Sequence, residues 1–134
     1  MVVEKIERNG LVYAIVVRHG SMGVKRNTFF TADEMPLQVG LIAHEKGYIE
    51  RVHYHPKARR AIMQTWQTLH MLKGIVEVNF YDNKGVRFKS IRIKAGDLIL
   101  LMDGAHNIKA ITDFLGESVK QGPYMGKKDK VEFD

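Results

Sequence analysis

Two histidines separated by one residue are the first feature of this chain that could do chemistry. His53 and His55 lie at the end of an apolar-rich run, residues 48–54, that is typical of a β-strand. Side chains alternate along a strand, so residues two apart point to the same face and the two imidazoles converge. Neutral imidazoles on a rigid strand supply half of a coordination shell for a divalent transition metal. The spacing alone is a weak signal, and a structural role for the pair stays open.

Composition limits the other chemistry that the chain can offer. It contains no cysteine, which excludes a disulfide scaffold, thiol nucleophiles and thiolate metal sites and leaves His, carboxylate and amide groups as ligands. Lys and Arg outnumber Asp and Glu by 21 to 15, giving a net charge of +6 that favours an anionic partner. The cations are scattered in small groups, and there is no helix-turn-helix pattern or aromatic-lined basic stretch. Nucleic acid is therefore the least favoured partner, and a solvated basic surface remains the alternative.

The elements that position these residues are predicted from short apolar runs and the turn residues between them. Asn9-Gly10 predicts a type I′ hairpin turn, because both residues tolerate positive φ. The β-branched run Leu11 to Val17 predicts the strand that follows the turn. Further strand-like runs occupy residues 28–31, 37–43, 48–54, 67–72, 75–81, 86–93, 98–101 and 107–111.

Short strands at regular spacing, without alternating helices, favour an all-β sandwich or barrel over a doubly wound α/β fold. The length of 134 residues with 45% hydrophobic residues fits a single domain, residues 1–134. Residues 56–65 begin with proline and contain good helix formers, so a short helix and an ordered loop both stay open. The chain after Gln121 is expected to form an extended arm.

No apolar run in the sequence has the length of a membrane span, and charged residues interrupt the apolar positions near its start. We therefore expect a cytoplasmic protein without a membrane partner. Exposed strand edges in small β-sheet proteins are often covered by a second copy, and the expected hairpin over residues 1–17 could do this. A homodimer is therefore predicted.

Around the histidine pair the sequence resembles the cupin superfamily. The first cupin motif runs Gly, five residues, His-x-His, three or four residues, Glu, six residues, Gly. Here Gly47 precedes His53-Tyr54-His55 by five residues, and Gln67 precedes Gly74 by six. Gln67 stands in the place of the acidic ligand, and eleven residues rather than three or four separate it from His55.

The second cupin motif runs Gly, five residues, Pro-x-Gly, two residues, His, three residues, Asn. Here Gly96 is followed after five residues by Met102-Asp103-Gly104 and then by His106. Met102 replaces the proline, His106 comes one residue early, and Ala110 replaces the asparagine. The resemblance covers residues 37–111 and implies a double-stranded β-helix, the cupin jelly-roll barrel, with an N-terminal hairpin and an extended C-terminal arm.

The resemblance implies that His53, His55 and His106 hold a divalent transition metal, either Fe, Mn, Ni or Zn, with Gln67 as a fourth ligand or beside them. Three neutral imidazoles leave the metal charge uncompensated, which favours an anionic ligand in an open position.

Cationic side chains near the histidine pair suit such a ligand. Arg51 has the same parity as His53 on the expected strand, whereas Glu50 has the opposite one. Arg51 could therefore bind a carboxylate or phosphate, and Lys57, Arg59 and Arg60 follow in a segment that could bend over the barrel mouth. A salt-bridged rim and solvated loop charge are the alternatives.

Near the C-terminus, Val119-Lys120-Gln121-Gly122-Pro123-Tyr124 followed by Asp129-Lys130 resembles small microbial cupins associated with surface-polysaccharide and nucleotide-sugar biosynthesis. This implies an anionic sugar derivative, such as a sugar phosphate or nucleotide sugar, as substrate or ligand. Isomerase or epimerase chemistry at a metal Lewis acid, a three-histidine Fe(II) dioxygenase and a non-catalytic binding module all stay open.

A general base is not identified by spacing. Glu77, Tyr48 and His70 are candidates without a motif. His70 lies three residues from Gln67 and is expected to face away from it on a regular strand.

Overall fold

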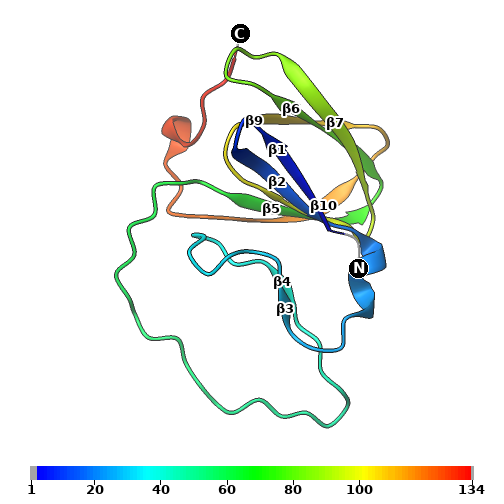
Figure 1. The fold of residues 1–134 in the computed structure, drawn as a ribbon, viewed down its shortest axis with the longest axis vertical. Coiled ribbons are helices and arrows are strands. Elements are labelled where there is room, and N and C mark those ends of the chain that lie inside the picture. The colour runs from blue at the N-terminus through cyan, green and yellow to red at the C-terminus, as the bar shows by residue number, and fades with distance from the viewer. Residues whose placement is uncertain (1–2, 134) are drawn as a thin grey trace.

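The computed structural model describes residues 3–133, apart from the side chains of residues 21 and 22. Residues 1, 2 and 134 of the expected domain lie outside this range. Ten antiparallel strands and two 3-10 turns make up the described chain, which contains no α-helix (Figure 1). The expected all-β class is therefore confirmed. The elements are β1 (Val3–Arg8), β2 (Leu11–Val17), η1 (His19–Gly23), β3 (Thr28–Phe29), β4 (Gly40–Leu41), β5 (Gln67–Lys73), β6 (Ile75–Tyr81), β7 (Arg87–Lys94), β8 (Leu98–Leu101), β9 (Ala105–Ala110), β10 (Leu115–Lys120) and η2 (Gly126–Asp129).

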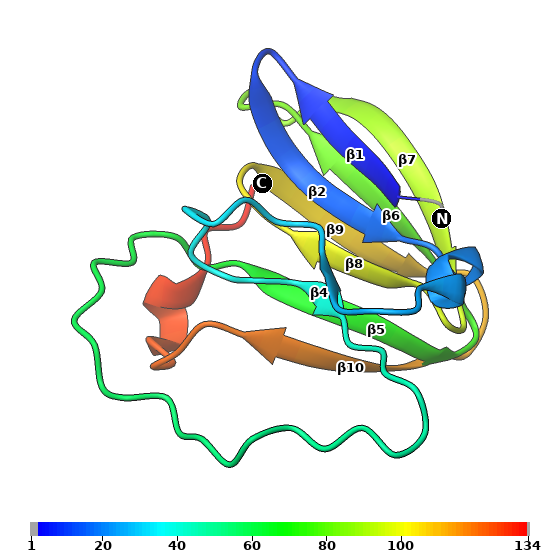
Figure 2. The same ribbon diagram turned by 60° about the horizontal axis from the view of Figure 1, so that its bottom comes forward.

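Two sheets form a sandwich, seen from the side in Figure 2. The larger sheet has the strand order β1-β2-β8-β5-β10, and the smaller has the order β7-β6-β9. Alternate residues of each strand point inward and make one apolar core between the sheets. Phe80, Met71, Ile93, Ile99 and Leu101 lie at its centre and are at most 1% exposed.

The predicted N-terminal hairpin is confirmed. Asn9 and Gly10 adopt positive φ values of 52° and 77°, as a type I′ turn requires, and join β1 to β2. Opposite Ile6 and Glu7 the register skips one residue of β2, which leaves Tyr13 as an extra residue in that strand. The Tyr13 ring then packs edge-on against Phe80 and Phe88 and ties the two sheets together.

A second apolar cluster covers the outer face of the larger sheet. Ile15, Leu100 and Met102 are packed there with Val39 and Trp66. The partly buried residues Phe30, Met35 and Leu37, from the chain around β3 and β4, lie against this cluster. β8 is therefore apolar on both faces because both faces are covered.

A buried carboxylate fixes the turn between β7 and β8. The Asp97 side chain accepts hydrogen bonds from the His19 amide at 2.7 Å and from the Lys94 amide at 3.0 Å. Its Oδ2 also lies 3.3 Å from the Arg18 guanidinium, which contacts Glu4 at 3.1 Å. Asp97 thus joins η1, the β7–β8 turn and the edge strand β1.

The strand predicted over residues 48–54 is wrong for this structure. Residues 42–65, here called the connecting segment, contain neither strand nor helix, and every residue from 44 to 65 is exposed. Within residues 37–43 only Gly40–Leu41 pairs, with β3. The physical reason is that β-propensity expresses packing and pairing, and no other described strand lies beside residues 48–54 to supply hydrogen bonds.

One strand was not predicted. β10 pairs with β5 although its sequence, Leu-Gly-Glu-Ser-Val-Lys, is polar and interrupted by glycine. It is an edge strand with one covered side, so it carries little of the apolar alternation that makes a strand visible in a sequence. The C-terminal arm that follows contains the 3-10 turn η2, held by an ion pair of Lys120 with Asp129 at 2.7 Å.

Candidate functional site

Gln67 is the first residue of β5 and faces the interior of the sandwich. In an antiparallel pair, directly opposite residues share a face, and Gln67 lies opposite Leu101 while Leu69 lies opposite Ile99. Leu101 and Ile99 both belong to the central core, so Gln67 shares their face. It is partly buried at the end of the larger sheet where β5 begins and β8 ends.

His106 faces the same interior from the smaller sheet. It lies opposite Phe80, which is fully buried, near the start of β9. Burial lowers the pKa of its imidazole below the ordinary 6.5, because the charged form loses hydration. At neutral pH His106 is therefore uncharged, which is the state that binds a metal ion.

The turn that carries the chain into β9 lies beside the start of β5. The Trp66 indole Nε1 donates a hydrogen bond to Asp103 Oδ1 at 3.0 Å. Trp66 directly precedes Gln67 in the sequence, and Asp103 lies three residues before His106. Gly104 adopts a φ of 86° and lies against the Tyr13 ring, where an added Cβ would clash with the ring carbons. Gln67 and His106 are thus held at one end of the sandwich by packed neighbours.

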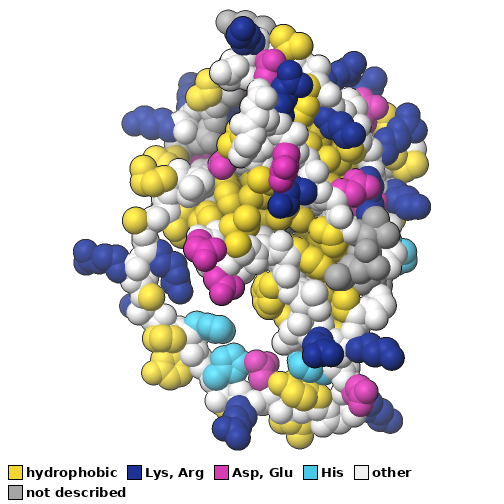
Figure 3. Space-filling view, viewed as in Figure 1, with side chains coloured by type: hydrophobic (Ala, Val, Ile, Leu, Met, Phe, Trp, Pro, Cys, Tyr) yellow, Lys and Arg dark blue, Asp and Glu magenta, His cyan; other side chains and the backbone are white. Residues whose placement is uncertain are grey.

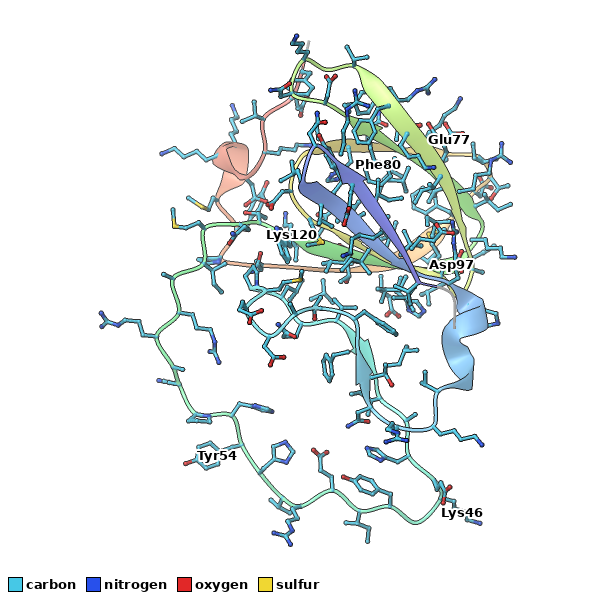
Figure 4. All side chains as sticks on the ribbon, viewed as in Figure 1. Lys46, Tyr54, Glu77, Phe80, Asp97 and Lys120 are labelled. Atoms are coloured by element: carbon cyan, nitrogen blue, oxygen red, sulfur yellow. The ribbon has the colours of Figure 1, made fainter. Side chains whose placement is uncertain are left out.

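The other predicted metal ligands lie elsewhere. His53 and His55 are exposed on the connecting segment, with ring centroids 5.3 Å apart. Figure 4 shows Tyr54, which lies between them in the sequence, far from Phe80, the residue opposite His106. The structure therefore places His53 beside His55 on the connecting segment and places Gln67 and His106 at one end of the sandwich, with the two pairs apart.

Local contacts give the His53 ring a defined orientation. Its Nδ1 lies 2.8 Å from the Arg51 carbonyl oxygen, to which it can only donate, and its Nε2 lies 3.5 Å from Glu50 Oε1. The expectation that Glu50 faces away from His53 is wrong, because it assumed strand alternation in a segment that is not a strand. Among the described residues, no group of three or more His, Asp or Glu side chains is close enough to hold a metal ion.

The predicted anion-binding residues also lie on the connecting segment. Arg51, Lys57, Arg59 and Arg60 are all exposed. In the space-filling view the segment stands off from the body of the molecule and carries several cationic side chains (Figure 3). The structure places these residues with the histidine pair, on the same segment, and away from Gln67.

The three candidates for a general base do not meet at the interior site. His70 lies opposite Leu98 and Glu117 on the outer face of β5, facing away from Gln67 as alternation predicts. Glu77 alternates with the buried Val76 and Val78 and so lies on the outer face of β6. Tyr48 stacks on His44 in the connecting segment, with ring centroids 3.7 Å apart.

Sequence reasoning missed two residues that shape the interior site. Asp103 and Tyr13 fix the turn before β9, but neither belongs to a motif with recognisable spacing. Trp66, the hydrogen-bond partner of Asp103, is only 4% exposed and belongs to the apolar cluster on the outer face of the larger sheet. Asp103-Gly104 is a residue pair typical of turns. Its hydrogen bond with Trp66, however, joins residues that are far apart in the sequence.

No helix in the described part of the chain has both the length and the apolar character needed to cross a membrane. Comparisons with protein-family models, with curated proteins and with solved structures find no match to this chain.

Proposed function

We propose that this protein is a metal-binding jelly roll of the cupin type that binds an anionic sugar derivative. In this proposal, residues 48–54, which are unpaired in the structure, pair with the outer edge of β9 when metal binds and so bring His53 and His55 to His106 and Gln67. The observation that carries it is the placement of Gln67 and His106, which face one interior from two different sheets at the same end of the sandwich. These are the two predicted ligands outside the histidine pair.

The strand edge needed for this addition is open. β9 pairs with β6 on one side, and in the part of the chain that the structure describes no strand pairs with its other side. The connecting segment is longer than ordinary loops, and loops of this length without secondary structure are typically either functional segments or linkers. It exposes Tyr48, Ile49, Val52 and Tyr54, residue types that favour a pleated, half-buried surface. In a strand that turns His53 inward, Ile49 has the same parity and would face the interior, whereas Tyr48, Val52 and Tyr54 would lie on the outer face. Full burial of an isoleucine side chain contributes about 1.5–3 kcal/mol.

The residues fit a divalent transition metal in their donor chemistry. His106 is uncharged at neutral pH, and His53 and His55 are exposed imidazoles on the connecting segment. Gln67 adds a neutral amide oxygen in place of a carboxylate. When bound, Fe, Mn, Ni or Zn would supply a Lewis acid that polarises a carbonyl or enediol oxygen. The uncompensated positive charge and the cations Arg51, Lys57, Arg59 and Arg60 favour a sugar phosphate or nucleotide sugar.

A non-catalytic binding module is the second candidate function. It is favoured by the neutral Gln67 and by the positions of Glu77 and His70, which point away from the interior site. An isomerase or epimerase needs a proton acceptor there, whereas a binding module does not.

Metal content tests the ligand set. We expect the purified protein to bind close to one equivalent of a transition metal by elemental analysis after exchange against Mn²⁺, Fe²⁺, Ni²⁺ and Zn²⁺ separately. His53→Ala and His106→Ala should each lower the stoichiometry or affinity severely. His44→Ala, an exposed histidine of the same connecting segment, is the matched control and should leave both unchanged. Equal metal binding in all four proteins would overturn the proposal.

Proteolysis tests the strand addition separately. Trypsin should cut the metal-free protein first within the connecting segment, at Lys46, Arg51, Lys57, Arg59 or Arg60, because this part of the chain is exposed and unpaired. Added metal should slow cleavage at Arg51, inside the added strand, more than cleavage at Lys127 in η2. Equal cleavage rates at Arg51 with and without bound metal would exclude the addition.

A ligand panel then distinguishes enzyme from binding module. Nucleotide sugars and sugar phosphates should bind more tightly than the matching neutral sugars, and the triple variant Lys57→Ala, Arg59→Ala, Arg60→Ala should reduce that difference. The pair Lys25→Ala, Arg26→Ala is the control for lost positive charge elsewhere. Binding without turnover would favour the module.

A further inference from the structure

The outer edge of β1 is open for pairing. β1 forms one side of the larger sheet and pairs with β2 alone among the described strands (Figures 1 and 2). Along its other side, unpaired backbone N–H and C=O groups form a template on which a further strand can add. The bulge in this hairpin lies in β2, at Tyr13, so the register within β1 is regular.

The charges of β1 are arranged symmetrically about its middle. Ile6 is flanked by Lys5 and Glu7, and these by Glu4 and Arg8. Two antiparallel β1 strands with Ile6 opposite Ile6 would place Lys5 opposite Glu7 and Glu4 opposite Arg8, twice each. Every charged residue of the strand then faces an opposite charge, which favours pairing, whereas like charges placed opposite one another oppose it. We propose that β1 pairs in this register with β1 of a second copy, so that the larger sheets of the two copies become continuous.

The neighbouring registers do not have this property. Alternate residues of a strand direct their hydrogen-bonding groups to the same edge. When a strand pairs with its own copy, allowed registers therefore differ by a shift of two residues of one strand along the other. A shift of two residues in one direction places Lys5 opposite Lys5. The same shift in the other direction places Glu7 opposite Glu7. The charges therefore specify one register.

The other sheet edges are less suited to self-pairing. β7 carries four cations, Arg87, Lys89, Arg92 and Lys94, and no carboxylate, so two copies would repel each other. In β10 the charges are Glu117 and Lys120, whose odd separation prevents them from lying opposite each other in an allowed register. β9 carries Lys109 without a carboxylate. Among these described edges, only the charges of β1 are self-complementary.

The space beside β1 suits an incoming strand. A groove of about 480 Å³ runs between β1 and β7, lined by Glu4, Lys5 and Glu7 on one side and by Phe88, Lys89 and Arg92 on the other. The cationic wall lies where the acidic residues of a second β1 would approach. Glu4 already contacts Arg18 at 3.1 Å, so in the pair it would lie between two guanidinium groups.

Charge reversal with compensation tests the pairing. Light scattering should give twice the chain mass of 15.3 kDa at high micromolar concentration and low salt. Lys5→Glu places a second carboxylate opposite Glu7 and should weaken the dimer at least about tenfold. Adding Glu7→Lys restores complementarity and should restore the dimer. Lys109→Glu on β9 is the matched control and should have no effect. A monomeric wild-type protein, or a dimer that Lys5→Glu leaves unchanged, would overturn the proposal.

Cross-linking tests the register itself. Because the chain has no cysteine, single substitutions can be paired without background disulfides. An equimolar mixture of Lys5→Cys and Glu7→Cys proteins should form a disulfide-linked dimer on mild oxidation, since these positions face each other. Either protein alone should cross-link much more slowly. Faster cross-linking of one protein alone than of the mixture would exclude this register.

Discussion

The indole of Trp66 donates a hydrogen bond to the carboxylate of Asp103 across 3.0 Å, and thereby joins the end of the connecting segment to the turn that enters β9. Gln67 follows Trp66 directly, and His106 follows Asp103 by three residues. This single contact therefore links the two strands that present the interior pair.

Removing this acceptor should destabilise the fold. Asp103→Ala leaves the buried indole N–H without its partner, which costs about 1–3 kcal/mol. Urea unfolding followed by tryptophan fluorescence measures the change, because Trp66 is the single tryptophan of the chain. Asp113→Ala, at an exposed carboxylate, is the control. If both variants unfold at the same urea concentration, the contact contributes nothing to stability.

Asp97 should be among the most sensitive acidic positions. Its carboxylate is buried and accepts hydrogen bonds from two backbone amides and the Arg18 guanidinium. Asp97→Ala leaves the two amides without their acceptor and removes one of the acceptors of Arg18, which keeps Glu4 and the Arg92 carbonyl. We expect a loss of about 2–4 kcal/mol in the free energy of unfolding. Asp97→Asn keeps an acceptor and should lose less. An alanine variant as stable as the wild type in urea would contradict this role.

Acid should weaken the turn between β6 and β7. Asp82 accepts hydrogen bonds from the Val86 and Lys84 amides at 2.9 Å each, and these bonds hold its pKa below the ordinary 3.8. A carboxyl with a lowered folded-state pKa contributes stability above its unfolded pKa and loses it as the pH falls through the folded pKa. The difference in urea midpoint between wild type and Asp82→Asn should therefore be present at about pH 6 and shrink as the pH falls through the lowered pKa of Asp82. A difference independent of pH would contradict this origin.

Restoring a carboxylate should strengthen the proposed metal site. Gln67→Glu faces the same interior position with a charged oxygen ligand, which binds divalent cations more tightly than an amide. Isothermal titration with Mn²⁺ should show at least about tenfold higher affinity. Gln64→Glu, at an exposed glutamine of the connecting segment, controls for the added charge. If Gln67→Glu leaves metal affinity unchanged, Gln67 does not face the metal.

The fold could be predicted where the pattern was local. β2, β6 and β8 have the predicted bounds, because their apolar residues and flanking turns lie next to each other in the sequence. β10 was missed because only its pairing with β5 makes it a strand. Residues 48–54 have strand-forming side chains, but their state depends on a distant partner that no local pattern can identify.

In the candidate site too, side-chain directions that follow from local strand alternation could be predicted, whereas contacts between residues distant in the sequence could not. Alternation on β5 predicted that His70 faces away from Gln67, and the register agrees. The approach of His53 and His55 to His106 depends on how the connecting segment lies relative to β9, which is far along the chain. It stays a prediction. The hydrogen-bond partner of Asp103 could not be predicted either, because Trp66 is distant from it in the sequence.

Both ends of the connecting segment are anchored in one place. Val39, just before β4, and Trp66, just before β5, belong to the same apolar cluster on the outer face of the larger sheet. The entropy of closing such a loop grows only with the logarithm of its length. The chain between these anchors can therefore be lengthened, shortened or exchanged at little cost to the core. That makes it the part of this protein in which new specificity can arise while the sandwich stays the same.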